Sequence, residues 1–411
     1  MTATLAAPPS RGWLSADSIR HGTVWLMLAL SFVVVIEPAP SDFVFFLALV
    51  MFARSGLQFS GSVAPLFAFL VIFLLGGMIS LIPFYTEFEA SKYVVVSIYM
   101  AIASIFFATY LATDSERRVA LVAQAWKAGA LIAATLGLLG AFDVAGLGPV
   151  FAEYGRAKGL FKDSNVFSTY LIFPAILLIQ AIALGRTRHR ILGPVALAIM
   201  VLSIVLSYSR GAQLNFLAAS TIMLVATFAL SDRPSTRLRI VGFSIVGLVA
   251  LGIMIAILLS VENIREIFLD RLTFAKSYDA GEKGRFASQL NSLPMLLDRP
   301  LGFGPIQFRN YFPNDPHNVY INGFSSYGWL GGIAYLLLTI STFVVGYKSM
   351  LIPSPVQYMA IAAFAVFVST SLQGVQIDTD HWRHYYWILG IVWGCYAAGI
   401  NKSDRSPMLP S

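Results

Sequence analysis

The feature that most constrains this chain is a series of apolar segments, most of them near the length of a membrane-spanning helix. A helix needs about 20 apolar residues to cross about 30 Å of hydrocarbon. Only helices and closed barrels satisfy their backbone hydrogen bonds inside a bilayer, so segments of this length predict an all-α, polytopic membrane protein. We predict about twelve spans, at residues 23–37, 43–58, 62–83, 92–113, 127–147, 166–185, 190–208, 211–231, 238–261, 319–347, 356–373 and 384–400.

The composition agrees with a membrane bundle. The chain is 57% apolar and 12% charged, whereas soluble domains average about 45–50% and about 25%. We therefore predict a single membrane domain over residues 1–411. The net charge of +7 is attributed to cytoplasmic anchoring, since no basic run with interleaved aromatic residues predicts a nucleic-acid partner. The one cysteine, Cys395, can form neither an intramolecular disulfide nor a cysteine metal cluster.

The distribution of lysine and arginine predicts the orientation of the spans. With a cytoplasmic N-terminus, more than half of the 28 Lys and Arg residues fall in cytoplasmic segments, and far fewer in the short outer ones. An even number of spans then places the C-terminus in the cytoplasm as well, and the first apolar segment is an uncleaved helix. On the outer face this topology brings together residues 154–165, Arg210, the long interval 262–318 and residues 376–384. We predict one site assembled from these helix ends.

The longest polar interval, residues 262–318, lies between the ninth and tenth predicted spans. Within it, large apolar residues recur at helical spacing over residues 286–297, which predicts a short amphipathic helix lying in the membrane interface. Arg285 would stand at the N-terminus of this helix, where backbone N–H groups favour anions. An interfacial arginine beside lipid head groups is the alternative interpretation.

Two further residues are candidates for chemistry. Arg210, in LSYSRGAQLNF, lies at the junction of two apolar spans. A lipid-facing arginine at mid-helix costs about 2.5–3.5 kcal/mol, so Arg210 either binds an anionic group at the outer rim or extends to the interface as an anchor. His317, in NDPHNVYINGF, precedes a span. Its ordinary pKa suits a general base for a hydroxyl nucleophile, with helix capping or metal ligation as alternatives.

Two other outer segments are candidate walls of the site. Residues 156–165, RAKGLFKDSN, carry three positive charges and can contact phosphate or sugar, although a solvated loop would have the same composition. Residues 376–383, QIDTDHWR, offer carboxylates and a tryptophan, which suit sugar hydroxyls and a sugar face. An ordinary interfacial belt has the same residue types.

These ordered motifs resemble the O-antigen ligase and polymerase family of bacterial membrane glycosyltransferases. Pro300-Leu301 is followed by glycines up to Gly304, and then come the His-Asn-x-Tyr motif at residues 317–320 and a Gly-x-x-Gly helix start at residues 328–331. YSRGA around Arg210 and GLFKDSN around Asn165 are similar to family elements in the same order. The resemblance covers about residues 150–390, the predicted catalytic region.

The resemblance implies a glycosyltransferase C-like helical fold in the bacterial inner membrane, with a periplasmic active site and no cofactor or metal. It implies a polyprenyl-diphosphate-linked oligosaccharide donor, a glycan acceptor and contact with other polysaccharide assembly proteins. His317 matches the family's essential histidine, and Arg210 and Arg285 match its two essential arginines. The side chains assigned to substrate binding are Arg156, Lys158, Asn165, Asn318, Tyr320, Asp380 and Arg383.

The chemistry of these residues agrees with such a transfer. Two arginines can hold a diphosphate bidentately and stabilise the charge that grows on it as the sugar–phosphate bond breaks. His317 would take the proton of the acceptor hydroxyl, and direct attack predicts inversion at the anomeric carbon. A polymerase is favoured over a ligase to lipid A core. A transporter or flippase of lipid-linked sugars is the alternative of another class, although ion-coupled carriers usually place acidic residues deep in their spans, which these spans nearly lack.

Overall fold

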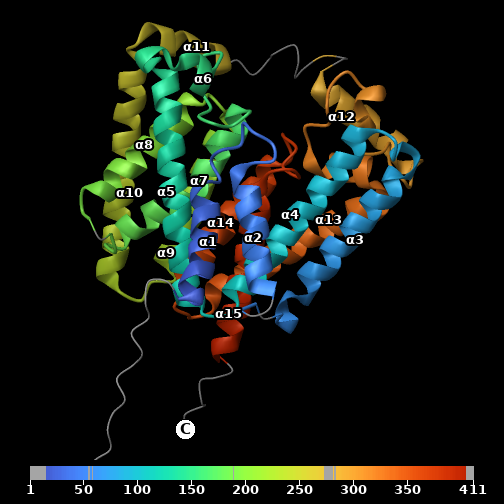
Figure 1. Ribbon diagram of the computed structural model, residues 1–411. Helices are drawn as coiled ribbons and strands as arrows, with labels where there is room; N and C mark the ends of the chain where they lie inside the picture. Colours follow the sequence, from blue (N-terminus) through green and yellow to red (C-terminus); the bar gives the residue numbers. More distant parts are fainter. Residues whose placement is uncertain are drawn as a thin grey trace, which may run out of the picture.

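The structure is a computed structural model that describes residues 15–53, 56–57, 59–187, 189–272, 281 and 284–403. It is a bundle of long helices with one small β-hairpin (Figure 1). The α-helices are α1 Ala16–Ala29, α2 Pro40–Ala53, α3 Ala64–Leu81, α4 Phe88–Leu111, α5 Ser115–Ala141, α6 Gly148–Phe151, α7 Ser164–Ala183, α8 Leu192–Leu206, α9 Arg210–Ala229, α10 Pro234–Leu259, α11 Glu262–Leu272, α12 Arg285–Leu297, α13 Val319–Leu351, α14 Gln357–Gln373 and α15 Arg383–Ser403. The strands are β1 Ala152–Glu153 and β2 Arg156–Ala157, and the 3-10 helices are η1 Gly61–Val63, η2 Ile82–Phe84, η3 Val144–Gly146 and η4 Gln307–Asn310.

The prediction of an all-α polytopic membrane protein is confirmed. An α-helix lies at every predicted span. Among the described residues, seven helices are long and apolar enough to cross a membrane, and α2, α8 and α14 are shorter apolar helices. The predicted amphipathic segment of the long interval is also helical, as α12.

The first predicted span, residues 23–37, has different limits in the structure. Helix α1 begins earlier, because the Ser15 side chain accepts a hydrogen bond from the Ser18 N–H and caps its N-terminus. The helix ends at Ala29, and the backbone N–H groups of Val34 and Val35 donate to the Leu160 carbonyl, 2.9 Å away in each case. The end of this apolar segment therefore packs as irregular chain against the loop before α7, which periodicity alone does not reveal.

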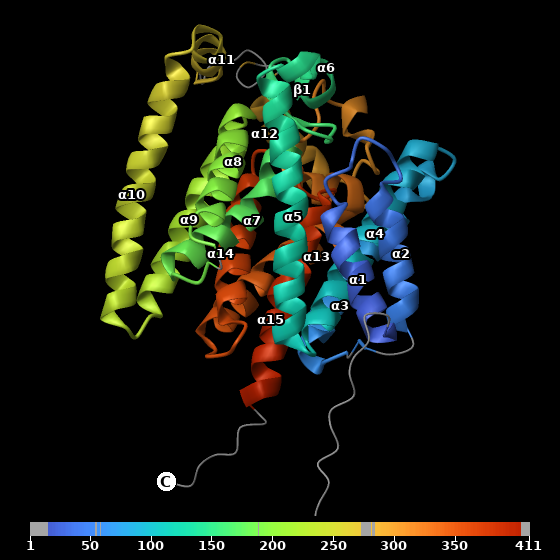
Figure 2. The ribbon, with the colours of Figure 1, turned by 60° about the vertical axis from the view of Figure 1, so that its left-hand side comes forward.

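The helices differ strongly in how deeply they are buried. Helix α7 is almost entirely enclosed, because 83% of its most apolar 18-residue stretch is buried. In α10 the corresponding share is 6%. Helices α14 and α15 also lie inside the bundle, where they pack against α9 and α4 (Figure 2). Helix α10 stands at the periphery and leads to α11. The buried centre is therefore formed by α7, α14 and α15, whose ends connect to polar loops.

Gly328, in the Gly-x-x-Gly motif of α13, fixes the loop that leads to His317. Helix α13 is interrupted at Gly328, whose φ of 64° and ψ of −172° favour glycine. The preceding loop docks into this break, where the Trp329 N–H donates to the Pro300 carbonyl at 2.8 Å and the Phe303 N–H donates to the Ser325 carbonyl at 2.8 Å. A Cβ on Gly328 would lie 2.6 Å from the Pro300 oxygen. This docking positions the chain between α12 and α13.

Helices α11 and α12 lie at the same end of the bundle, which we call the loop end (Figure 1). On α12, the side chains of Phe286, Leu290 and Leu297 are 50%, 68% and 69% exposed, while Ser288 and Ser292 are buried against the protein. A short helix with an exposed apolar face at the loop end can lie in the membrane interface, as predicted.

Candidate active site

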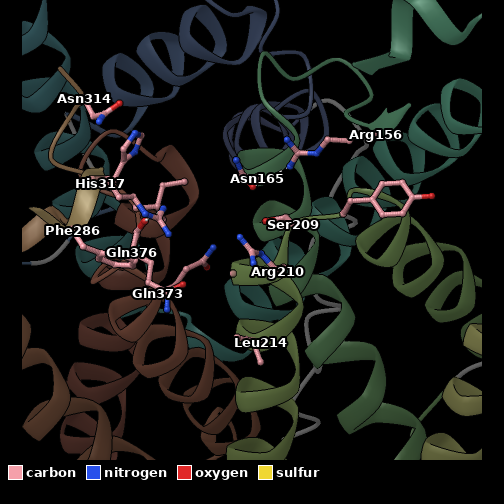
Figure 3. Close-up of a pocket in the computed structure, with 14 residues that line it drawn as sticks. Arg156, Asn165, Ser209, Arg210, Leu214, Phe286, Asn314, His317, Gln373 and Gln376 are labelled. Carbon is pink, nitrogen blue, oxygen red and sulfur yellow. Dashed lines mark hydrogen bonds between the residues drawn. The ribbon is translucent and has the colours of Figure 1, made fainter. Parts of the chain in front are cut away.

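A cavity of about 370 Å³ lies at the loop end, where α7 and α9 begin and α14 ends. Its lining includes Arg156, Asn165, Arg210, Arg285 and His317. Figure 3 shows His317 on one wall, and Arg156, Asn165 and Arg210 on the wall that faces it. Among the described residues that line the cavity, none is acidic. Three guanidinium groups and an imidazole from distant parts of the sequence therefore meet in one cavity.

Arg210 is placed by a tight reversal between two spans. Helix α8 ends at Leu206, and Tyr208 adopts a φ of 50° that turns the chain back. The Ser209 side chain then accepts from the Ala212 N–H and caps α9, so Arg210 stands in the first turn of that helix. The reversal directs the side chain of Arg210 into the cavity rather than along the surface of a continuous helix (Figure 3).

Arg156 reaches the same wall from the β-hairpin. The turn residues Tyr154 and Gly155 both have positive φ, at 50° and 74°, as a two-residue hairpin turn requires. The Nε of Arg156 donates to the Ser207 carbonyl at 2.8 Å, and its Nη2 donates to Asn165 Oδ1 at 3.2 Å. These bonds join the hairpin, the start of α7 and the reversal before Arg210 into one wall.

Arg285 occupies the first position of α12, as predicted, and lines the opposite wall. Its Nη1 donates to the Gln376 carbonyl at 3.3 Å, and its guanidinium lies 5.0 Å from the Phe286 ring centroid. Gln289, one turn further along α12, donates to the Pro316 carbonyl at 2.8 Å. Helix α12 is thus tied both to the segment after α14 and to the segment that carries His317.

His317 lies just before α13 in a strained backbone conformation, with a φ of 44°. The carboxyl group of Asp378 holds this conformation. Its Oδ2 accepts the His317 N–H at 3.1 Å, and its Oδ1 accepts the Asn318 N–H at 3.0 Å. Burial raises the pKa of Asp378, and the nearby charge of Asp380 raises it further. This carboxyl group was not predicted from the sequence as a partner of His317.

Asp380 lies in a buried polar cluster behind the cavity. Its Oδ2 accepts hydrogen bonds from the Tyr93 hydroxyl at 2.6 Å and the Asn322 amide at 3.1 Å, and it pairs with His381 Nδ1 at 3.0 Å. Burial opposes the charge of Asp380, but His381 and these donors outweigh it, so the pKa of Asp380 is lowered. Because Asp380 is 3% exposed and is not among the lining residues, the structure gives it a packing role between α4, α13 and the segment after α14.

Four more residues assigned to substrate binding also lie outside the lining of the cavity. The Arg383 guanidinium pairs with Asp42 Oδ2 at 2.9 Å. The Asn318 side chain caps α13 by accepting from the Tyr320 N–H at 3.0 Å, and the Tyr320 hydroxyl donates to the Ser371 carbonyl at 2.8 Å. Lys158 is half-buried beside the hairpin. Arg156 and Asn165 remain as the assigned binding residues that the cavity contains.

Gln373 and Gln376 line the cavity but were not singled out as binding residues from the sequence. Gln373 ends α14 and is 7% exposed. Its Oε1 accepts from the Asn215 amide at 2.6 Å, which fixes the orientation of its own amide nitrogen. The only available sequence signal was a polar residue at the end of an apolar span. Within the described part of the chain, no group of three or more His, Cys, Asp or Glu residues is placed to hold a metal ion.

Comparison with known proteins identifies the segment that carries these residues. Residues 195–336 match the family model Wzy_C, described as O-antigen ligase. The chain contains an O-antigen ligase domain. No curated protein matches the chain. The O-antigen ligase domain includes Arg210, Arg285 and His317, so both walls of the cavity come partly from the matched segment.

The match at residues 195–336 confirms the resemblance seen in the sequence motifs. The match supports the O-antigen ligase and polymerase family for residues 195–336 of this membrane protein. Arg156 and Asn165 lie before the matched segment, and Gln373 and Gln376 lie after it. The helices around the O-antigen ligase domain therefore complete the cavity.

Proposed function

We propose that this protein polymerises oligosaccharide repeat units carried on a polyprenyl diphosphate, at the periplasmic face of a bacterial inner membrane with both chain termini in the cytoplasm. The observation that carries the proposal is the convergence of Arg156, Arg210, Arg285 and His317 on one cavity. A diphosphate with its first sugar is a compact anion at the membrane surface. A cationic cavity at the end of a helical bundle suits it in charge and in location.

The arrangement of the arginines supports diphosphate binding. A guanidinium presents a planar fork of donors that can hold two phosphate oxygens at once. Arg156 and Arg210 approach from one wall and Arg285 from the other, so the diphosphate would lie between them. Donors placed in advance around the leaving group stabilise the negative charge that grows on it as the glycosidic bond to phosphate breaks. We propose that the arginines supply this stabilisation without a metal ion.

His317 is the proposed general base. Its imidazole lines the same cavity, and its backbone is fixed by Asp378 through the two N–H bonds described above. It would accept the proton of the acceptor hydroxyl as that oxygen attacks the anomeric carbon. The new glycosidic bond forms as the bond to the diphosphate breaks, with inversion at that carbon.

The test is turnover by the purified full-length protein with a lipid-diphosphate oligosaccharide and a chelator present. Formation of a longer glycan, with release of the lipid diphosphate, is the expected result. Arg309→Gln is a matched control, because the Arg309 guanidinium pairs with Asp315 and does not line the cavity. Movement of the intact lipid-linked sugar across vesicles, without formation of a glycosidic bond, would instead identify a flippase.

A ligase that transfers the finished glycan to lipid A core is the second candidate, because the matched family model is described as O-antigen ligase and its match does not separate the two activities. Polymerase and ligase use the same donor and differ in the acceptor. A strain that lacks the protein separates them by its glycans. Single repeat units at the surface indicate a lost polymerase, whereas long chains that remain on the lipid carrier indicate a lost ligase.

A further inference from the structure

A second polar cavity, of about 340 Å³, lies at the end of the bundle opposite the loop end. It is lined by residues near the start of α5, the end of α7 and the start of α14. The active-site cavity lies where α7 begins and α14 ends, so the two cavities occupy opposite ends of the same two helices. The polar side chains of the second cavity are Gln124, Lys127, Gln180, Arg186 and Tyr358.

Two cations from different elements meet in this cavity. Lys127 belongs to α5 and is half-buried, and Arg186 belongs to the connection after α7 and is exposed. In the described chain, neither the Lys127 ammonium nor the Arg186 guanidinium has a hydrogen-bonding or ion-pairing partner. A charged side chain within a membrane span normally pairs or faces a water-filled space. Both cations are therefore available to a ligand in the cavity.

The direction of α5 agrees with this placement of the two cations. A helical side chain points toward the N-terminus of its helix, and α5 begins at the same end of the bundle at which α7 ends. Lys127 and Arg186 both line the cavity. No acidic residue is among the described lining residues, and Glu116, in the first turn of α5, lies outside them.

The remainder of the lining is amphipathic. The Gln124 and Gln180 amides and the Tyr358 hydroxyl supply neutral donors, while small and aliphatic residues of α5 and α7 form an apolar wall. More arginines surround this end, and Arg239 Nη1 donates to the Leu184 carbonyl at 3.0 Å beside the cavity. A cavity with two cations and an apolar wall suits a phosphate group at the surface of a bilayer.

We propose that the cavity between α5, α7 and α14 binds a phosphate group, which Lys127 and Arg186 hold together, either from an anionic phospholipid or as free phosphate. A guanidinium fork and an ammonium can share the oxygens of one phosphate. Basic pockets between membrane helices bind anionic head groups in this way. The site is separate from the glycosyltransferase cavity and does not depend on the proposed transfer reaction.

The experiment measures binding to the purified full-length protein in a non-ionic detergent. Native mass spectrometry and the thermal unfolding midpoint are recorded with dioleoylphosphatidylglycerol, with dioleoylglycerol, which lacks the phosphate, and with inorganic phosphate. We expect phosphatidylglycerol to bind and stabilise the wild type more than dioleoylglycerol does. Lys127→Met and Arg186→Gln should each weaken this binding about tenfold, the effect of one lost charged hydrogen bond.

The controls separate the cavity from the general positive charge of this end. Arg190→Gln removes an exposed cation from the same connection but does not alter the lining, so it should bind phosphatidylglycerol as the wild type does. Lys127→Arg should retain most of the binding. If Lys127→Met does not fold, Arg186→Gln decides, since its side chain is exposed.

Each outcome bears on the proposal. Stabilisation by inorganic phosphate alone, lost in Lys127→Met and Arg186→Gln, supports the site with a soluble ligand. The proposal is overturned if phosphatidylglycerol and dioleoylglycerol bind equally and inorganic phosphate does not raise the unfolding midpoint. Binding that is unchanged in both variants, or reduced equally in Arg190→Gln, also overturns it.

Discussion

The placement of His317 can be tested by removing the side chain that holds its backbone. In Asp378→Ala, the N–H groups of His317 and Asn318 both lose the acceptor that lies 3.1 and 3.0 Å away. Both bonds are part-buried, so each lost bond costs about 0.5–1.5 kcal/mol, and the left-handed backbone of His317 costs about 1–3 kcal/mol itself. Without these two bonds the backbone strain is no longer offset, so the segment should relax away from the φ of 44° seen in the structure.

The expected result is a loss of rate rather than of donor affinity. A displacement of about 1 Å in a catalytic group costs about 100-fold in rate, so kcat for transfer should fall by about 100-fold. The donor KM should change by no more than about threefold, because the arginines that would bind the diphosphate keep their places. Steady-state transfer rates of the purified variant at several donor concentrations measure both quantities.

Two companion variants make this test decisive. Asp378→Asn keeps one acceptor and should retain an intermediate rate. Asp315→Asn, which changes the carboxyl group that pairs with Arg309 on the same loop, should transfer at nearly the wild-type rate. A wild-type kcat in Asp378→Ala would refute the anchoring of His317. A large rise in donor KM with unchanged kcat would refute it as well.

Three further predictions follow from the same geometry. Arg210→Lys should lower kcat/KM for the lipid-diphosphate donor by about 100-fold, since an ammonium cannot reproduce the bidentate fork; a wild-type value would make Arg210 a simple anchor. Gly328→Ala should lower the free energy of unfolding by at least about 1–2 kcal/mol, because its φ is 64° and the new Cβ meets the Pro300 oxygen. In contrast, Gly242→Ala on α10, with open space around it, should not destabilise the protein. Finally, the raised pKa of Asp378 means that its carboxyl contributes stability at low pH that is lost as the pH rises above about 4. The unfolding free energy of the wild type should therefore fall more between pH 5 and pH 8 than that of Asp378→Asn, and equal slopes would contradict the shift.

Much of the scaffold could be predicted because span length and apolar content are properties of local sequence. The positions of the long helices, the amphipathic α12 and the place of Arg285 at its start all follow from periodicity. The limits of α1 do not, because the apolar segment from Val33 onward bonds to the loop before α7 instead of extending the helix. That choice depends on a partner about 125 residues away in the chain, and no local pattern encodes such a partner.

The residues of the candidate site also divide into those that the sequence could predict and those that it could not. Arg210 and His317 stand out because a charged or titratable side chain beside an apolar span needs a reason to be there. The sequence could not show which polar residues of the walls face the cavity, since that depends on how each helix is rotated. Asp380 accepts a hydrogen bond from Tyr93, and Arg383 pairs with Asp42. Gln373, in contrast, lines the cavity. The role of Asp378 was equally hidden, because its partners are backbone N–H groups.

The most direct test of the proposed active site is the rate at which the purified His317→Ala variant forms glycosidic bonds. The assay follows glycan extension and release of the lipid diphosphate together, with thermal unfolding and binding of the donor as checks on the fold and the arginines. We predict that both products disappear while the donor still binds, because the cavity keeps Arg156, Arg210 and Arg285 but loses its only imidazole among the described lining residues. Transfer at the wild-type rate by this variant would contradict the assignment of His317 as the base.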